Sequence, residues 1–149
     1  MTKSVAMVAH DRMKTELCEW VEKNQEQFKG RKIVATGTTG KLLLSYVPEL
    51  DITAVKSGPL GGDQQLGAMI AEGQLDALFF FQDPMTPQPH DSDIKALVRL
   101  ATVYDIPIAC NPSTANYMIS SPYFDHPEKA PGAEDVSEQF EDYLHREIS

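Results

Sequence analysis

The chain has 149 residues, with 13 Lys or Arg against 22 Asp or Glu and a formal net charge of −9 at pH 7. This length suits one domain with its own hydrophobic core, so we expect a single domain over residues 1–149. The negative charge argues against binding to nucleic acid or to an anionic membrane surface. It does not exclude a small anionic ligand, which a few local amides and cations can hold.

The cysteines and the apolar segments indicate where the protein resides. Cys18 and Cys110 lie far apart and form no CxxC motif, a usage typical of a reducing compartment. The N-terminus has too short an apolar run for a signal peptide, and the longest run, Ala77–Phe81, is too short to cross a membrane. We therefore predict a cytoplasmic protein.

Short apolar segments alternate with amphipathic ones along the chain. In chain order the pattern predicts strand Ser4–Ala9, helix Asp11–Phe28, strand Lys32–Thr36, helix Thr39–Val47, strand Ile52–Ser57, helix Gly62–Gly73, strand Asp76–Phe81, helix Asp93–Asp105, strand Ile106–Cys110, helix Thr114–Ser121 and a last helix over Asp135–Ile148. This alternation predicts an α/β fold in three layers, a parallel sheet with helices on both faces.

The loops that follow the predicted strands contain most of the unusual residues. Ligands bind beyond the carboxyl ends of parallel strands, and two of the four histidines, His10 and His90, fall in these loops, each followed by Asp. The carboxylates of Asp63, Asp83 and Asp93 fall there as well. Each Asp alone could be a helix cap or a turn residue. Caps have no reason to gather with histidines, so we predict a site at this edge.

The segment TGTTGK, Thr36–Lys41, is a candidate phosphate-binding loop. It is not a Walker A motif, because Ala35 and Leu42 stand where that motif needs Gly and Ser or Thr. Its hydroxyls and helix-start amides could hold one phosphoryl group. Alternatively, it simply begins a helix with Thr38 as the N-cap. Lys14 is likewise either an anion ligand or a surface lysine, and the sequence leaves both alternatives open.

Two other kinds of chemistry are less favoured. A metal site would draw on His10, Asp11, His90, Asp91 and Asp93. No helix-spaced His pair and no Glu-x-x-His motif supports it, so we expect no metal. Ser57 is followed by Gly-Pro rather than by a nucleophile-elbow pattern, which argues against a catalytic serine.

Several blocks of the sequence resemble the bacterial methylglyoxal synthase family. These blocks are VAHDRMK, ATGTTGKL, SGPLGGDQQLGAMIAEG, DP, PHDSDIKALVRLATVYDIPIACN and ISSP, and the match runs from about Val8 to Pro122. The resemblance implies a five-stranded parallel sheet of order 3-2-1-4-5 and a homohexamer. It implies conversion of dihydroxyacetone phosphate to methylglyoxal and inorganic phosphate without metal or organic cofactor, and inhibition by phosphate.

The resemblance also implies a role for each matching residue. Asp63 would be the catalytic base, acting with His90 and with Asp93 close by. The substrate-binding residues would be His10, Lys14, Thr36, Gly37, Thr38, Thr39, Ser57, Gly58 and His90. Asp11 and Asp83 would line the site.

The sequence departs from the family pattern in three places. Gln82 stands where relatives often have an aromatic residue, Ser92 replaces a common proline, and the segment after Pro122 matches poorly, with Arg146 as an uncertain equivalent of a family arginine. Two other functions remain alternatives. One is a sensor of phosphorylated ligands, like the regulatory domain of carbamoyl phosphate synthetases, which needs only the phosphate-binding residues. The other is a sugar-phosphate isomerase using the same base.

Overall fold

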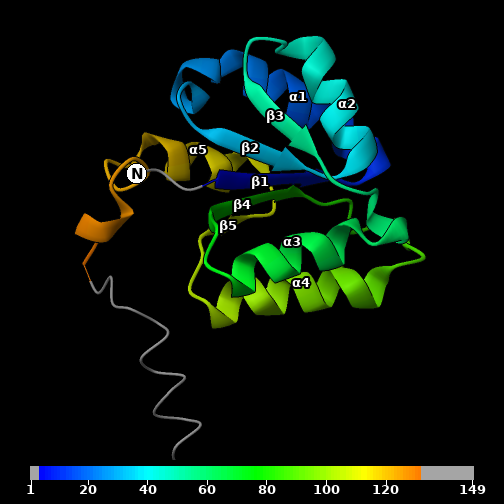
Figure 1. Cartoon of the computed structure of the whole chain (residues 1–149). Helices are drawn as coiled ribbons and strands as arrows, with labels where there is room; N and C mark the ends of the chain where they lie inside the picture. Colours follow the sequence, from blue (N-terminus) through cyan, green and yellow to red (C-terminus); the bar gives the residue numbers. More distant parts are fainter. Residues whose placement is uncertain (1–3, 132–149) are drawn as a thin grey trace, which may run out of the picture.

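A computed structural model describes residues 4–131 and confirms the α/β fold with a parallel sheet. Five strands form one sheet in the order β3-β2-β1-β4-β5 (Figure 1), as the family resemblance implies. The strands are β1 (Ser4–Ala9), β2 (Lys32–Ala35), β3 (Asp51–Ala54), β4 (Leu75–Phe81) and β5 (Ile108–Ala109). All four pairings are parallel, so the carboxyl ends of the strands lie at one edge.

Helices cover both faces of the sheet. Within residues 4–131 the α-helices are α1 (Lys14–Lys23), α2 (Gly37–Tyr46), α3 (Gly62–Ala71), α4 (Asp91–Val103) and α5 (Pro112–Ser120). Single 3-10 turns are η1 (Asp11–Met13), η2 (Gln25–Phe28), η3 (Gly58–Leu60) and η4 (Pro127–Lys129). Helices α1, α2 and α5 lie on one face, and α3 and α4 lie on the other (Figure 1).

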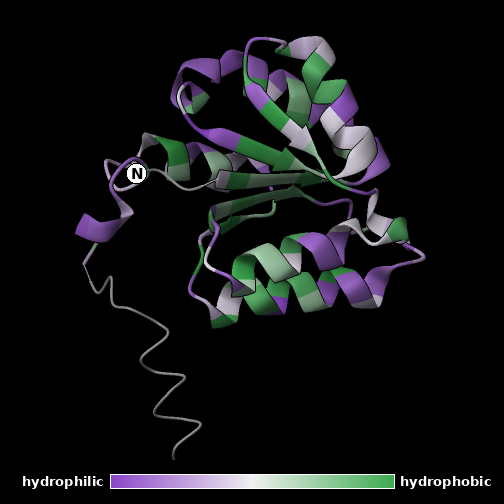
Figure 2. Ribbon diagram, viewed as in Figure 1, coloured by the Kyte–Doolittle hydropathy of each residue, from purple (hydrophilic) through white to green (hydrophobic). Residues whose placement is uncertain are grey.

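The central strands divide the core into two parts. Strand β4 reads LDALFFF, and its continuous apolar run Ala77–Phe81 is expected for a strand covered on both faces. Its Phe79 and Phe81 pack on the side of α1, whereas Leu78 and Phe80 pack on the side of α3 and α4. The helices carry both hydrophobic and hydrophilic residues, as expected when one face lies on a sheet (Figure 2).

The predicted first helix, Asp11–Phe28, is wrong as a single element. It is divided into η1, α1 and η2, and α1 ends at Asn24, whose backbone leaves the helical region and whose side chain donates to the Trp20 carbonyl. An Asn that bonds the backbone in this way competes with helix continuation. The predicted helix Asp135–Ile148 and Arg146 lie outside the described residues.

Several strand and helix ends also differ from the prediction. Strands β2 and β3 end at Ala35 and Ala54, so Thr36 and Ser57 lie beyond them, as the residues that precede α2 and η3. Strand β5 has two residues instead of the predicted Ile106–Cys110. Helix α2 begins at Gly37, which makes Thr36 rather than Thr38 its N-cap residue. No helix in residues 4–131 is long and apolar enough to cross a membrane.

The aromatic cluster around Phe79 supplies a stability prediction. Phe79 is fully buried, and its ring lies 5.4 Å from the Trp20 ring and 5.8 Å from the Phe28 ring. Phe79→Ala should lower the free energy of unfolding by about 3–5 kcal/mol, because it leaves a cavity. Urea denaturation measures this change. The control Leu44→Ala, on an exposed position of α2, should change it by less than about 1 kcal/mol, and equal losses would contradict the core assignment.

Candidate active site

The loops at the carboxyl edge of the sheet bring the predicted site residues together from several elements. His10 follows β1, Thr36 follows β2, Ser57 follows the β3 end and Asp83 follows β4. Asp63 lies in the first turn of α3, and His90 immediately precedes α4. Their convergence follows from the parallel sheet, because consecutive parallel strands deliver their following loops to the same edge.

Asp63 and His90 form a carboxylate–imidazole pair in the site. The Asp63 side chain is buried, with 2% of the residue exposed, and neither carboxylate oxygen has a hydrogen-bond partner among residues 4–131. The His90 Nε2 atom lies 3.5 Å from Asp63 Oδ2, within reach of an ion pair. Burial raises the pKa of Asp63 above its usual value, the nearby charge of His90 opposes this rise, and Asp93 adds to it. The carboxylate is thus a stronger base than a solvated one.

His10 is held in one orientation by the chain after β4. The backbone N–H of Asp83 donates to His10 Nδ1 at 2.8 Å, so in the neutral ring Nδ1 is the acceptor and Nε2 carries the proton. That Nε2 atom is buried and has no partner in the described residues. Burial lowers the pKa of His10, and the charge of His90 lowers it further. His10 therefore presents a neutral N–H donor.

Two glycines allow the loop after β3 to approach α3 and His90. A Cβ atom on Gly58 would lie 2.8 Å from His90 Nε2 and 3.2 Å from Asp63 Oδ2. A Cβ atom on Gly62 would lie 2.0 Å from the carbonyl oxygen of Lys56, and the Gly62 N–H donates to the Ser57 carbonyl at 2.8 Å. Gly58 and Gly62 therefore serve close approach, which a side chain would prevent.

The start of α2 supplies hydroxyl groups beside this loop. Thr36 and Thr39 are both buried, and the Thr39 hydroxyl has no hydrogen-bond partner in the described residues. The Gly37 N–H, however, donates to the Lys56 carbonyl at 3.2 Å, and a Cβ on Gly37 would lie 3.0 Å from the Ser57 nitrogen. Gly37 therefore joins the loops after β2 and β3. The N–H groups that remain free in the first turn of α2 therefore belong to the residues after Gly37.

The remaining predicted residues lie around the histidines. Lys14 pairs with Asp11, and this hydrogen bond lowers the pKa of the Asp11 carboxyl. Asp83 accepts from the Met85 N–H at 3.2 Å through Oδ1, while its Oδ2 is buried without a partner. Asp93 is half-buried, and its N–H donates to the His90 carbonyl at 3.0 Å. In residues 4–131, no group of three or more His, Cys, Asp or Glu is arranged to hold a metal ion.

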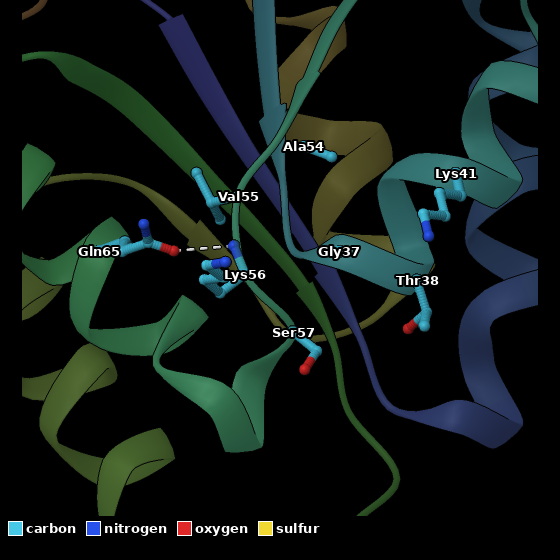
Figure 3. A pocket seen from close by; sticks show the side chains of 8 residues that line it. All are labelled: Gly37, Thr38, Lys41, Ala54, Val55, Lys56, Ser57 and Gln65. Carbon is cyan, nitrogen blue, oxygen red and sulfur yellow. Dashed lines mark hydrogen bonds between the residues drawn. The ribbon is translucent and has the colours of Figure 1, made fainter.

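A pocket of about 570 Å³ opens beside the ends of β2 and β3 (Figure 3). Gly37, Thr38 and Ser57, all predicted to bind substrate, line it together with Lys41, Lys56 and Gln65. Lys41 ends the candidate phosphate-binding segment Thr36–Lys41, whereas the sequence predicts no role for Lys56 or Gln65. Gln65 Oε1 accepts the backbone N–H of Lys56 at 2.7 Å, which ties the loop before Ser57 to α3. This contact joins two loops across a turn, so no periodic pattern in the sequence signals it.

The buried charge of Asp63 supplies a prediction about stability and pH. Because burial raises its pKa in the folded state, ionised Asp63 destabilises the fold above that pKa. Asp63→Asn should therefore raise the melting temperature at pH 7 by about 2–4 °C, or about 1 kcal/mol. The gain should shrink as the pH falls through the folded pKa, where the wild-type carboxyl becomes neutral. Thermal unfolding followed by circular dichroism between pH 7 and pH 4 measures it.

Asp51→Asn is the matched control, because Asp51 is exposed at the start of β3. It should leave the melting temperature nearly unchanged across the same pH range. An Asp63→Asn protein that melts at or below the wild-type temperature at pH 7 would show that the carboxylate is not held at a desolvation penalty.

Comparisons with known proteins place the whole arrangement in one family. The family model described as the MGS-like domain matches residues 16–110. Methylglyoxal synthase of Oleidesulfovibrio alaskensis is 58% identical over 121 residues, covering 81% of this chain and 82% of that protein. The corresponding enzyme of Proteus mirabilis is 54% identical over 127 residues, covering 85% and 83%. A crystal structure of methylglyoxal synthase from Elizabethkingia anophelis, 50% identical, matches with a TM-score of 0.76 and covers 81% and 79% of the two chains. The chain belongs to the methylglyoxal synthase family.

Proposed function

We propose that this protein is a lyase that converts dihydroxyacetone phosphate to methylglyoxal and inorganic phosphate. The observation that carries the proposal is the buried carboxylate of Asp63, which accepts no hydrogen bond from the described residues and lies 3.5 Å from His90 Nε2. A base of this kind, next to hydroxyl-bearing loops suited to a phosphate, matches a substrate with an acidic C–H group and a phosphate ester.

The phosphate of the substrate would bind at the loops after β2 and β3. The donors there are the hydroxyls of Thr36, Thr38, Thr39 and Ser57, with the first free N–H groups of α2 and the backbone of Gly58. A helix N-terminus favours a bound anion through its free N–H groups and its dipole. Lys14 would add positive charge by exchanging its contact with Asp11 for the phosphate.

The reaction would begin with Asp63. Its carboxylate removes a proton from the hydroxymethyl carbon beside the ketone. The electron pair of the broken C–H bond forms a C=C bond to the ketone carbon, and the π pair of the ketone moves onto its oxygen to form an enediolate. The raised pKa of Asp63 makes this transfer less uphill than it would be for an exposed aspartate. Asp93 acts through its charge, which adds to the rise in that pKa.

The two imidazoles would stabilise the enediolate. His10 offers a buried Nε2–H, because its Nδ1 atom is committed to the Asp83 N–H. The His10 and His90 rings lie 6.4 Å apart between centroids, nearly perpendicular, so both can face one small substrate. A neutral imidazole suits an enediolate oxygen, since a donor close in pKa to the enediol stabilises charge without fully protonating it.

Phosphate elimination would complete the reaction. The hydroxyl on the deprotonated carbon loses its proton and becomes an aldehyde carbonyl, the C=C electron pair shifts to the bond with the CH2 carbon, and the C–O bond to phosphate breaks. Inorganic phosphate leaves with the electrons of that bond, and protonation of the CH2 carbon of the remaining enolate gives methylglyoxal. This step requires the C–O bond to stand roughly perpendicular to the enediolate plane, so that it overlaps the π system. The hydroxyl-lined loops would set that orientation, and orientation rather than affinity would decide between elimination and isomerisation.

One assay separates the proposal from its two alternatives. Purified protein is incubated with dihydroxyacetone phosphate, and methylglyoxal, free phosphate and glyceraldehyde phosphate are followed together. Equal release of methylglyoxal and phosphate supports the lyase. Glyceraldehyde phosphate would indicate an isomerase, and binding without turnover would indicate a sensor.

Replacement of the base tests the first step. Asp63→Asn should lower kcat by about 10³–10⁵-fold, because the amide cannot accept the substrate proton at neutral pH. Its affinity for a phosphorylated substrate analogue should change by less than about tenfold, since the phosphate contacts remain. Steady-state kinetics and calorimetric titration measure the two effects. Turnover close to that of the wild type would assign the base to another residue.

Replacement of His90 tests the donor role. His90→Gln keeps an N–H donor of similar reach but cannot match an imidazole in acidity, so kcat should fall by about 10²–10³-fold with a smaller change in KM. Asp91→Asn, one residue further on and exposed, is the control and should retain activity. Loss of phosphate binding in His90→Gln, measured by titration with inorganic phosphate, would place His90 in the phosphate site instead.

Two features implied by the family resemblance stay predictions. One is the homohexamer, and the other is inhibition by inorganic phosphate. The second follows physically from the proposal, because the released phosphate would fit the same hydroxyl-lined loops that hold the ester.

A further inference from the structure

The pocket in Figure 3 carries positive charge that the proposed chemistry does not use. Lys41 of α2 and Lys56 after β3 both line it, and both side chains are exposed. Within the described part of the chain, neither lysine takes part in an ion pair. The pocket lining also contains no carboxylate. Two unpaired lysines therefore face a hollow with no local counter-charge.

What distinguishes the two pocket lysines is their shared position. Four cations of residues 4–131, Lys14, Lys29, Arg31 and Lys95, each contact a carboxylate. Other cations in the same residues take part in no ion pair, but Lys41 and Lys56 line one pocket together. The field that they produce there is not cancelled by a described carboxylate in the pocket lining.

The pocket is continuous with the proposed phosphate site. Lys41 follows Thr38 by three residues on α2, so the two side chains share one face of the helix. Lys56 directly precedes Ser57, and the Gln65 side chain fixes the Lys56 backbone through a 2.7 Å hydrogen bond. Each lysine therefore has a hydroxyl donor of the proposed phosphate site as its neighbour. The two hydroxyl residues themselves line the pocket.

The other side of the site is acidic. Asp63, Asp83 and Asp93 lie near the histidines, and the exposed Asp11 carboxylate lies beside Lys14. Arg12 and Lys14 offset part of this negative charge, since Arg12 acts on Asp83 and Lys14 pairs with Asp11. In the pocket, by contrast, the described lining residues carry positive charge without a carboxylate, which favours the approach of a phosphate dianion.

We propose that Lys41 and Lys56 attract the phosphate dianion of the substrate through this pocket and deliver it to Thr38 and Ser57. The inference rests on the proposed function, since it names the approach to that same site. The lysines act before the chemical step, through the electrostatic potential at the mouth of the site. They contribute to substrate capture and not to proton transfer or to elimination.

The test uses the double variant Lys41→Gln/Lys56→Gln in the assay with dihydroxyacetone phosphate. At low ionic strength KM should rise about three- to tenfold while kcat stays within about twofold of the wild type. The dependence of kcat/KM on KCl between about 20 and 300 mM should be weaker in the variant, because added salt screens the attraction that the variant has lost. The double variant Lys41→Arg/Lys56→Arg keeps the charge and should restore the wild-type KM.

The matched control is Lys23→Gln/Lys32→Gln, which removes the same charge at the end of α1 and the start of β2, away from the carboxyl edge of the sheet. It should leave KM and the salt dependence nearly unchanged. An equal effect of the control would show that only net charge matters and would overturn the proposal. An unchanged KM and salt dependence in the pocket variant, or a fall in kcat alone, would also overturn it. A wild-type protein without turnover would instead contradict the proposed function itself.

Discussion

The site depends on one unfavourable placement, a buried carboxylate that accepts no hydrogen bond from residues 4–131. Asp63 occupies the first turn of α3, and the preceding glycine-rich loop passes so close that a Cβ on Gly58 would lie 3.2 Å from its Oδ2 atom. Gly62 makes that close approach possible by lying against the Lys56 carbonyl, and Gly58 leaves room for His90 beside the carboxylate. Without these approaches Asp63 would reach solvent and would titrate as an ordinary acid.

The two halves of the sheet carry different parts of the site. The loops after β2 and β3 present hydroxyls and lysines, whereas α3, α4 and the loop after β4 present carboxylates and imidazoles. His10 follows the central strand β1, so it lies between the halves and is oriented by the loop after β4. A substrate with an anionic ester at one end and a weakly acidic carbon at the other matches this division.

The sequence predicts those helices and strands whose type follows from the pattern of apolar residues within one segment. Strand β4 is recognisable because LDALFFF has no polar alternation, and the sheet order agrees with the family resemblance. The first helix was mispredicted because its end at Asn24 is decided by one side chain bonding to the backbone, which competes with an otherwise helical pattern. The N-cap of α2 was predicted at Thr38 but lies at Thr36. This error has the same cause, since local backbone geometry decides where a helix begins.

The site also has a part that the sequence predicts and a part that only the packing of the fold decides. Loop position after the strands brings His10, Asp63 and His90 to one edge, but only three-dimensional packing places His90 3.5 Å from the carboxylate. The contact of Gln65 with the Lys56 backbone crosses a turn whose geometry no spacing rule specifies. The pairing of Lys41 with Lys56 in one pocket was not predicted for a related reason, since the two residues lie on different elements that only the fold brings together.

The strand order also governs when the site can form. In β1, Val5 pairs with Ile33 of β2 and also with Ala77 of β4, which is much further along the chain. The first pairing closes a short loop, whereas the second must await the synthesis and docking of a distant segment. The hydroxyl-bearing half can therefore assemble early, while His10 acquires its Asp83 partner only after β4 has docked. A chain in which only the first three strands had paired would carry the hydroxyl-bearing loops but would lack the Asp83 N–H that orients His10.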